Sequence, residues 1–424
     1  MYDSAVLRDL LILTKDGEWG KGEPSHDLLE MLVIRGADFN EARFCDLKNI
    51  PVRFIPKHIA ERKQLQPEDI LIETAGGTKD RPTGRTVFLK SRLFRNSSKP
   101  ITCASFSRFL RIDKSRAFPE YVFWYLQYLY KNGQMEQHQV QHTGVARFQY
   151  TKFAESIVIP LPPLPEQRAI ASILGTLDDK IELNRRMNET LEAIARAIFK
   201  SWFVDFDPVR AKAEGREPAD MDAETAALFP DSFEETELGM VPKGWVVKTI
   251  GDIMELVYGK ALKEECRKPG KVPVFGSNGQ VGWHNETLAD GPGIVVGRKG
   301  NPGIVTWSQT DFFSIDTTFY VLPKDPCMSM YYLLYGLRNQ DLASLGADSA
   351  VPGLNRNLAY MSKMLVPSVM VLEAFNKCTA ILHKKIHANN EQSHNISAIR
   401  DALLPKLVTG ELMVADGKEV VRTS

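Results

Sequence analysis

The sequence predicts a mixed α+β or α/β protein built from two globular domains, each followed by a long helix. The two helices are expected to pack as an antiparallel coiled coil, so that the chain forms an internal pseudo-two-fold repeat. Three observations support this prediction: an apolar seam with a period of 3.5 residues in mid-chain, a second copy of that seam near the end, and short β-like runs between turns before each seam.

The chain has 424 residues, which is long enough for about two to four domains. We expect a first domain, a spacer helix, an acidic linker, a second domain, and a second helix with a tail. Their expected ranges are residues 1–160, 161–205, 206–240, 241–368 and 369–424. A hydrophobic content of 43% gives both domains enough apolar side chains for a core.

The first domain is expected to hold an irregular sheet and one buried helix. Its β-like runs are Met31–Ile34, Ile70–Ile72, Thr86–Leu89 and Phe109–Ile112. The helix lies near Pro119–Tyr130 and carries aromatic and Leu side chains on most of its faces, which indicates burial.

The spacer helix is predicted over Leu161–Phe203. Pro165 and Glu166 suit its first turn, where a missing N–H costs nothing and a carboxylate favours the helix dipole. Steps of 4 and 3 residues then join the seam positions Ile170, Leu174, Leu177, Ile181, Asn184, Asn188, Leu191, Ala195 and Ile198. Polar Asn in the middle of such a seam commonly fixes the register against a partner helix.

The stretch Ala211–Leu238 is rich in acidic residues and contains Pro218 and Pro230. Its charge and low apolar content predict a linker with at most one short helix and no core of its own.

The second domain repeats the pattern of the first. Its β-like runs are Val272–Phe275, Gly293–Val296, Ile304–Trp307 and Phe319–Leu322, and they precede an aromatic helix at Tyr331–Leu337. A last helix is predicted over Val371–Leu404, stopped by Pro405. Its seam positions are Leu382, Ile386, Asn389, Ser393, Ile396 and Leu403.

Alignment of the two halves supports a diverged repeat. Setting Lys180 against Lys385 without gaps gives six identities in twenty positions, and Asn184 then lies opposite Asn389. Upstream, one constant offset places Phe109, Lys114, Tyr121 and Tyr125 opposite Phe319, Lys324, Tyr331 and Tyr335. Each long helix is therefore the expected partner of the other. The N-terminal Asp3–Gly22, in contrast, shows little likeness to Thr249–Ala261.

The charges balance overall but are unevenly distributed. There are 53 basic and 53 acidic residues, yet residues 1–158 carry 24 basic against 19 acidic, residues 159–240 carry 9 against 17, and residues 241–424 carry 20 against 17. Lys79–Arg116 holds eleven basic residues and two acidic ones. Such a concentrated basic run is typical of nucleic-acid contact.

Several classes of protein are disfavoured. No apolar run approaches the length of a membrane span and the N-terminus is not a signal peptide, so we expect a cytoplasmic protein. The odd number of cysteines argues for reduced, mostly buried thiols. The histidines His284, His383, His387 and His394 are expected on solvent-exposed polar faces. Phosphate-loop, amino-methyltransferase, GxSxG and HExxH motifs are absent, so we expect no catalytic residue and no bound metal.

The polar loops contain the side chains that read DNA. Arg, Asn and Gln bind guanine or adenine edges bidentately, and Lys and Arg bind phosphates. Glycines in the same loops allow close approach of the backbone. The candidate DNA-binding residues are Lys79, Arg81, Arg85, Lys90, Arg92, Arg147 and Gln149 in the first half and Asn278, Arg298, Lys299, Asn301, Asn355, Arg356 and Asn357 in the second. We expect Arg85→Ala or Arg298→Ala to weaken DNA binding. Each change should relax the recognition of only one part of the DNA target, the part read by its own domain.

Three segments resemble one protein family over essentially the whole chain. They are Pro160–Ile170 with its Pro-Glu-Gln-Arg, Leu183–Arg186, and Leu403–Leu412. Val296–Gly300 followed by Asp316–Phe319 adds to the likeness. On these motifs the chain resembles the specificity subunit of type I restriction–modification systems. It departs from the family at Pro367–Phe375, which lacks the Pro-Glu-Gln of the first copy.

The resemblance implies a non-catalytic subunit with two target recognition domains, each reading one half of a bipartite double-stranded DNA sequence. It implies two modification (methyltransferase) subunits as partners, with restriction subunits bound through them. S-adenosylmethionine, ATP and Mg²⁺ would bind to those partners, leaving no cofactor in this chain. The residues expected to form the spacer and dock partners are Glu166, Gln167, Arg168, Ile170, Leu174, Leu177, Ile181, Asn184, Leu191, Ile198, Leu382, Ile386, Asn389, Ile396 and Leu403.

Two other functions compete with this reading. A protein–protein scaffold with a coiled-coil spacer would need no direct contact with DNA, and the basic run Lys79–Arg116 argues against it. A nuclease or methylase in its own right would need a metal or cofactor site, and no motif for one is present.

Overall fold

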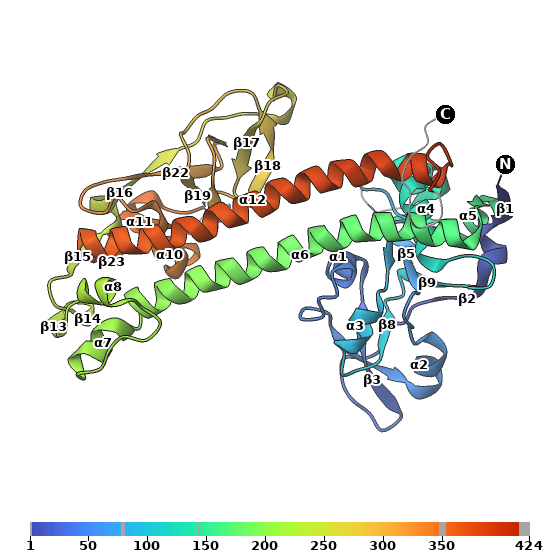
Figure 1. The fold of residues 1–424 in the computed structure, drawn as a ribbon, viewed down its shortest axis with the longest axis horizontal. Helices are drawn as coiled ribbons and strands as arrows, with labels where there is room; N and C mark the ends of the chain where they lie inside the picture. Colours follow the sequence, from blue (N-terminus) through green and yellow to red (C-terminus); the bar gives the residue numbers. More distant parts are fainter. Residues whose placement is uncertain (1, 78–80, 143–144, 347–352, 415–424) are drawn as a thin grey trace. The chain divides into compact units, whose positions relative to one another are not determined.

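The computed structural model describes residues 2–77, 81–142, 145–346 and 353–414. The chain forms two compact units: unit 1 comprises Met1–Leu183 with Gln392–Ser424, and unit 2 comprises Asn184–Glu391. Two 40-residue helices, α6 (Leu164–Phe203) and α12 (Val369–Val408), each contribute to both units (Figure 1). Within the described residues, no helix has the length and apolarity required to cross a membrane.

Unit 1 contains two main sheets. The first is antiparallel with the order β2-β9-β5-β7, and the second has the order β4-β3-β8, in which β3 and β8 are parallel. The strands are β2 (Leu11–Asp16), β9 (Ser107–Ile112), β5 (Ile70–Glu73), β7 (Thr86–Phe88), β4 (Val52–Pro56), β3 (Leu28–Ile34) and β8 (Ile101–Cys103).

Smaller elements complete unit 1. Strands β1 (Asp3–Val6) and β12 (Val158–Leu161) pair with each other, and β10 (Gln139–His142), β11 (Val145–Phe148) and β6 (Ala75–Gly77) form a small sheet. The helices are η1 (Leu7–Leu10), η2 (Gly36–Asp38), α1 (Phe39–Arg43), α2 (Lys57–Lys63), α3 (Ser91–Arg95), α4 (Pro119–Lys131), η3 (Glu136–His138) and α5 (Tyr150–Ser156).

Unit 2 has the same two sheets. The first is antiparallel with the order β16-β22-β19-β20, and the second has the order β18-β17-β21, in which β17 and β21 are parallel. The strands are β16 (Met254–Tyr258), β22 (Thr318–Pro323), β19 (Gly293–Gly297), β20 (Val305–Ser308), β18 (Gly279–His284), β17 (Val272–Gly276) and β21 (Phe313–Ser314).

The smaller elements of unit 2 also follow unit 1. Strand β15 (Val246–Thr249) pairs with β23 (Lys363–Val366), as β1 pairs with β12. The other elements are α7 (Asp207–Ala213), α8 (Ala223–Ala227), β13 (Phe233–Thr236), β14 (Gly239–Pro242), α9 (Ile250–Ile253), η4 (Glu264–Cys266), α10 (Met330–Asn339), η5 (Leu342–Leu345) and α11 (Arg356–Met361).

The internal repeat is therefore present in the strand order of the two units. The registers agree as well, because Phe109 pairs with Lys15 and Leu71 whereas Phe319 pairs with Tyr258 and Val296. The N-terminal segment β1–η1–β2 occupies the place of β15–α9–β16, although their sequences show little likeness. Backbone pairing preserves this correspondence where the side chains have diverged.

The long helices run antiparallel within each unit. In unit 1, Ile170 and Leu174 of α6 join Leu404 and Leu407 of α12 in one buried cluster. In unit 2, Phe199 of α6 stacks 6.0 Å from Phe375 of α12, between ring centres, in a core that also contains the α10 aromatics. Apolar side chains thus fix each end of the helix pair.

The seam residues pack inward as their spacing predicts. Asn184 donates from Nδ2 to the carbonyl of Asn389 at 3.2 Å, and Asn389 donates from Nδ2 to Oδ1 of Asn188 at 2.8 Å. Asn184 and Asn389 are buried, as are Ile170 and Leu174. The remaining apolar positions are half-buried: Leu177, Ile181, Leu191, Ile198, Leu382, Ile386, Ile396 and Leu403.

The structure differs from the linker expected between the domains. Residues 206–240 form α7, α8 and strand β13, and Val209 and Phe229 enter the unit 2 core. The ring of Phe229 packs 5.1 Å from that of Trp202. A few apolar side chains at favourable positions anchor a segment whose average composition is acidic.

Two other expectations were wrong. Helix α12 continues through Pro405 to Val408 because Leu404, Leu407 and Val408 are buried in unit 1, and this burial offsets the backbone hydrogen bond that proline removes. His284 and His383 are buried rather than solvent-exposed, with 4% and 3% of their surface accessible. Both are held by hydrogen bonds and aromatic neighbours.

Candidate nucleic-acid interface

Arg85, a candidate base reader, is engaged inside unit 1. Its guanidinium donates to both carboxylate oxygens of Glu73, at 2.9 and 2.8 Å, and to the carbonyl of Gly36 at 2.7 Å. The Glu73 side chain is 3% exposed. Contact with a base edge would compete with this pairing to a buried carboxylate, and contact of Arg85 with DNA stays a prediction.

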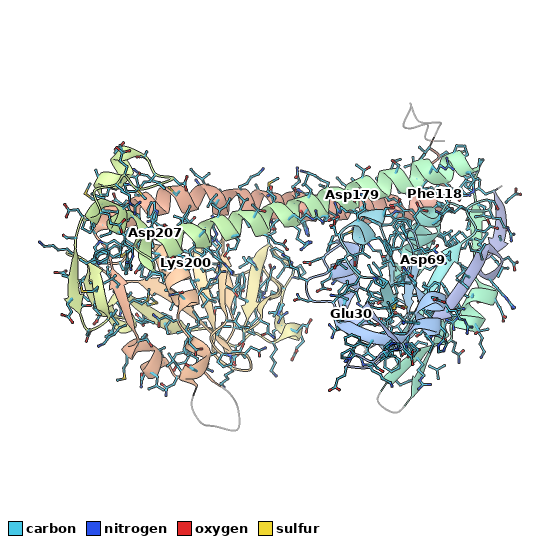
Figure 2. All side chains as sticks on the ribbon, turned by 90° about the horizontal axis from the view of Figure 1, so that it is seen from below. Glu30, Asp69, Phe118, Asp179, Lys200 and Asp207 are labelled. Carbon is cyan, nitrogen blue, oxygen red and sulfur yellow. The ribbon has the colours of Figure 1, made fainter. Side chains whose placement is uncertain are left out.

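Lys90 and Arg92 are engaged by helix α6. Lys90 pairs with Asp179 (labelled in Figure 2) and lies 3.9 Å from Glu182, while Arg92 pairs with Glu182, whose side chain is 2% exposed. These two residues attach the sheet domain of unit 1 to α6. The acidic residues of α6 neutralise both cations, and contact of Lys90 and Arg92 with DNA stays a prediction.

A neighbouring carboxylate, that of Asp178, completes this α6 cluster. Arg43 binds it through two hydrogen bonds of 2.9 and 2.6 Å, and Arg400 of α12 binds it at 2.7 Å. Burial alone would raise the pKa of Asp178, but the charge and hydrogen bonds of Arg43 and the charge of Arg400 outweigh it and hold that pKa below its usual value. Asp178 is thus a buried, ionised contact point.

The Pro-Glu-Gln-Arg motif at the start of α6 also stabilises unit 1. Gln167 is 1% exposed; its Oε1 accepts from the backbone N–H of Phe118 at 2.8 Å, and its Nε2 donates to the carbonyl of Pro162 at 2.8 Å. Glu166 accepts from the Tyr2 hydroxyl at 2.6 Å, and Arg168 lies over the Phe118 ring. Gln167 therefore joins the start of α4 to α6 rather than facing a partner.

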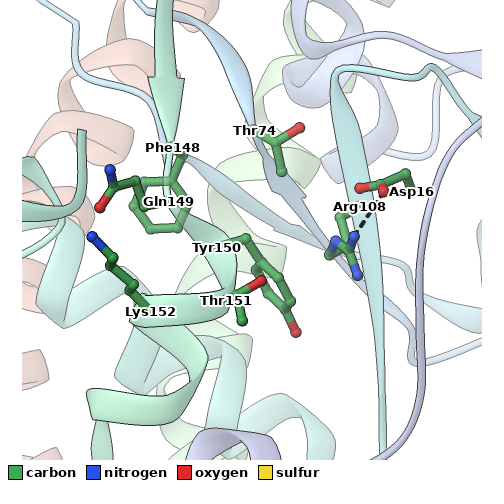
Figure 3. Close-up of a pocket in the computed structure, with 8 residues that line it drawn as sticks. All are labelled: Asp16, Thr74, Arg108, Phe148, Gln149, Tyr150, Thr151 and Lys152. Carbon is green, nitrogen blue, oxygen red and sulfur yellow. Dashed lines mark hydrogen bonds and ion pairs between the residues drawn. The ribbon is translucent and has the colours of Figure 1, made fainter. Parts of the chain in front are cut away.

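Other candidate residues of unit 1 remain at the surface. Arg81 and Arg147 are exposed, and neither has an ion pair among the described residues. Lys79 lies outside the described residues. Gln149 lines a shallow pocket of about 430 Å³ together with Asp16, Thr74, Arg108, Phe148, Tyr150, Thr151 and Lys152 (Figure 3).

The pocket combines a cation with an aromatic ring. Arg108 lies 4.5 Å from the centre of the Tyr150 ring and donates to Asp16 at 2.7 Å (Figure 3). Burial raises the pKa of Tyr150 above its ordinary value, which already keeps a tyrosine hydroxyl protonated at neutral pH. Lys152 is exposed at the same rim.

The equivalent region of unit 2 gathers most of the candidates from the second half. Arg298 and Lys299 begin the loop after β19, and both of their backbone N–H groups donate to the carbonyl of Thr317, at 2.9 and 3.1 Å. Arg298 and Arg356 stack on the ring of Tyr258, which is 46% exposed. Lys299 is exposed and has no ion pair in the described part of the chain.

The asparagines of this region differ in their roles. Asn301 donates from Nδ2 to Oδ1 of Asn278 at 2.6 Å, which leaves one polar group of each amide directed elsewhere. Asn355 caps helix α11, its Oδ1 accepting from the N–H groups of Asn357 and Leu358, and its role in base reading stays a prediction. The Asn357 side chain is exposed.

Sequence reasoning missed Tyr258, Arg108 and Tyr150. Their position becomes apparent only from strand register, because Tyr258 ends β16 beside Phe319 and Arg108 lies in β9 beside Asp16. The constant offset between Phe109 and Phe319 already aligned these strands. Extending that alignment to the neighbouring strands would have indicated that Tyr258 and Arg108 lie at the same end of the two sheets.

Comparison with known proteins identifies the family. The model described as "Type I restriction modification DNA specificity domain" matches residues 59–193 and 242–356, one match in each half of the repeat and more than half of the chain together. The chain belongs to this family. The resemblance inferred from the Pro-Glu-Gln-Arg and C-terminal motifs is therefore confirmed.

Relatives of this specificity-domain protein carry corresponding names. The type I restriction enzyme HindI specificity subunit of Haemophilus influenzae is 28% identical over 323 residues, covering 61% of this chain and 69% of that protein. The type I restriction enzyme MjaIX specificity subunit of Methanocaldococcus jannaschii is 26% identical over 318 residues, covering 69% of each.

A solved structure shares the fold of this family member. The crystal structure of a type I restriction–modification S subunit from M. genitalium aligns with a TM-score of 0.58 over 96% of both chains, at 17% sequence identity. The two-domain, two-helix architecture is thus the fold of a known specificity subunit.

Proposed function

We propose that this chain is the sequence-specific DNA recognition subunit of a type I restriction–modification complex and that each unit reads one part of a bipartite target. The observation that carries this proposal is the repetition of one sheet architecture, with a specificity-domain match in each half and cationic residues at the same end of the sheet in both units. In unit 1 this end is formed by the last residues of β2 and the first residues of α5. In unit 2 it is formed by the last residues of β16 and the first residues of α11.

The residues available for recognition are those that the units leave at least partly exposed. In unit 1 they are the exposed Arg81, Arg147 and Lys152 and the half-buried Gln149, and in unit 2 the exposed Asn278, Lys299, Asn301 and Asn357. Arginine and amide side chains bind base edges bidentately. Arg147 and the Asn278–Asn301 pair are our leading base readers.

Specificity subunits of type I systems assemble with other subunits and bind DNA. We propose that two modification subunits bind to this chain and that restriction subunits join through them. S-adenosylmethionine, ATP and Mg²⁺ would then bind to the partners. The seam residues and Gln167 pack internally, so docking would use other faces of α6 and α12.

Methylome sequencing of a host that carries this chain with its partner genes tests the proposal. The expected result is a methylated target of two short specified segments separated by unspecified bases. Arg147→Ala should alter one segment and Asn301→Ala the other. Lys271→Ala, which removes an exposed cation away from the rim, is the control and should alter neither.

A continuous target, or one in which both segments change together in a single variant, would contradict the assignment of one segment to each unit. An interaction scaffold that does not read DNA predicts no sequence-dependent methylation at all. The same experiment therefore separates the two functions.

A further inference from the structure

Unit 2 holds two arginines against one tyrosine, and no acidic partner for them lies among its described residues. Cζ of Arg298 lies 5.0 Å, and Cζ of Arg356 4.7 Å, from the centre of the Tyr258 ring. Among the described residues neither guanidinium forms an ion pair, and the Nε–H of each is buried without a hydrogen-bond acceptor. Two like charges therefore lie against one aromatic ring.

The backbone holds the two arginines together. The carbonyl of Arg298 accepts from the N–H of Leu354 at 2.8 Å, and Arg356 is the first residue of α11 directly after this contact. Tyr258 in turn packs 4.9 Å from the Phe319 ring, between ring centres. The positions of both cations are therefore determined by the fold rather than by flexible side chains alone.

Such an arrangement favours an anion. Two neighbouring positive charges repel each other, and an anion bound to both replaces that repulsion with attraction. Stacking on a ring orients a guanidinium while leaving its N–H edge free for hydrogen bonds. Because Tyr258 is 46% exposed, the site is open to a ligand from solvent.

Unit 1 offers an internal contrast. There Arg108 stacks on Tyr150, but Asp16 supplies its carboxylate at 2.7 Å. Asp16 is the residue after Lys15, which is the strand partner of Phe109. The residue at the same place in unit 2 is Gly259, which follows Tyr258, the strand partner of Phe319.

No acidic side chain fits at Gly259. A Cβ built there would lie 2.1 Å from the carbonyl oxygen of Ile315, a contact with backbone that no small shift relieves. The fold of unit 2 therefore excludes the counterion that unit 1 provides at this position. Among the described residues no carboxylate pairs with Arg298 or Arg356, and the one acceptor of the Arg356 guanidinium is the carbonyl of Leu256, at 3.5 Å.

We propose that Tyr258, Arg298 and Arg356 form a phosphate clamp that binds a phosphodiester group of the DNA backbone, with Tyr258 as the platform that orients both arginines. This inference rests on the proposed function and gives Arg298 a different role from the base reading that the sequence led us to expect. Phosphate contacts fix the position of a protein on the duplex and carry no sequence information directly.

The test measures binding of the purified full chain to a fluorescently labelled random-sequence duplex at increasing NaCl concentration. Each of Arg298→Ala and Arg356→Ala should lower the slope of log affinity against log salt by about 0.9, which corresponds to a roughly eightfold weaker affinity at 0.1 M salt. Tyr258→Ala should weaken binding similarly, whereas Tyr258→Phe retains the ring and should bind like the wild type.

Two controls keep the test specific. Lys271→Ala removes an exposed cation of unit 2 away from Tyr258 and should leave the slope unchanged. Arg298→Lys and Arg356→Lys keep the charge and should retain most of the slope, which shows that the alanine variants lose a contact rather than the fold. Thermal melting of every variant confirms folding.

Unchanged slopes in both arginine-to-alanine variants would overturn the clamp. So would a loss confined to the methylation target at an unchanged slope, because the arginines would then read bases. A wild-type chain that binds random duplex but does not prefer the target in the assembled complex would instead count against the proposed function. A wild type that binds no duplex would overturn both.

Discussion

Arg43 of α1 and Arg400 of α12 bind the same carboxylate, that of Asp178 on α6. The Asp178 side chain is 5% exposed, and the two arginines are 22% and 13% exposed. One acidic residue therefore connects the sheet domain of unit 1 to both long helices. Lys90 and Arg92 add two more attachments to the next turn of α6.

Asp178→Asn should destabilise unit 1 by about 3–5 kcal/mol, because it leaves the partly buried guanidinium of Arg43 without its counterion and removes one of the two carboxylates that bind Arg400. Urea denaturation of the full chain measures the change. Glu214→Gln, which removes an exposed partner of Arg216, is the matched control and should cost less than about 1 kcal/mol. An equal effect of the two substitutions would show that the cluster around Asp178 contributes little to stability.

Arg92→Ala should lower stability without changing the salt dependence of DNA binding. Its partner Glu182 is 2% exposed and keeps Lys90 at 3.9 Å, so loss of the pair removes the nearer cation from a buried carboxylate, at a cost of roughly 1–3 kcal/mol. Denaturation and salt titration on the same preparation measure the two effects. A smaller salt dependence of DNA binding at unchanged stability would indicate that Arg92 contacts DNA.

Arg85→Met should also act through stability. Glu73 is 3% exposed and would lose both hydrogen bonds to the guanidinium, for an expected cost of about 3–5 kcal/mol. The double variant Glu73→Leu with Arg85→Met removes both charges and should recover part of that loss. Methylation mapping measures whether Arg85→Met relaxes the recognition of one half-site. If it does so at unchanged stability, the assignment of Arg85 to a stabilising buried pair is wrong.

His383 should make unit 2 less stable at acidic pH. Burial lowers the pKa of His383 to about 4, and its Nε2 lies 2.9 Å from the Tyr335 hydroxyl. Because the unfolded chain binds the proton near pH 6.5 and the folded chain does not, stability falls as pH drops from about 6.5 towards 4, by up to about 3 kcal/mol. Below pH 4 this loss stops growing.

Denaturation midpoints between pH 7 and 4 measure the His383 effect. His383→Gln keeps a hydrogen-bonding group and should flatten the pH dependence by that amount. The exposed His394 on the same helix serves as the control, since His394→Gln should leave the profile as it is. An identical profile for wild type and His383→Gln would refute the prediction.

Glu120 should have the opposite effect in unit 1. Burial raises the pKa of Glu120 to about 7, although the charge of Lys90 lowers it in part. The folded chain then holds a proton that the unfolded chain releases above pH 4.5, so stability falls as pH rises from about 4.5 to 7. Glu120→Gln should stabilise the protein by about 1–2 kcal/mol at pH 8 and have almost no effect at pH 4.5. Equal effects at both pH values would exclude the raised pKa.

The regular elements could be predicted from the sequence because their patterns are local. The seam from Ile170 to Ile198 follows one helix face, and the alignment of Phe109 with Phe319 places the central strands of both units. The segment 206–240 could not be read in this way, since its core residues Val209 and Phe229 are isolated in an acidic context. The helix end predicted at Pro405 was wrong for a similar reason, because burial of the neighbouring residues outweighs the tendency of proline to end a helix.

The candidate site was harder to predict than the fold. A basic residue in a Gly-rich loop looks the same in sequence whether it faces solvent or a carboxylate far along the chain. Arg92 and Glu182 are separated by 90 residues, so their pairing depends on tertiary structure. The exposed Arg147, in contrast, has no such partner among the described residues.

Unit 1 is built from two segments that are far apart in the chain, Met1–Leu183 and Gln392–Ser424, and are therefore synthesised at different times. Its core includes Leu404, Leu407 and Val408, and Arg400 binds Asp178, so the first 183 residues leave the ribosome before these contacts exist. All of unit 2 is synthesised in the interval. During translation, unit 2 can therefore close around its own helix segments first, while Ile170 and Leu174 lack their α12 neighbours until the last turns of that helix emerge.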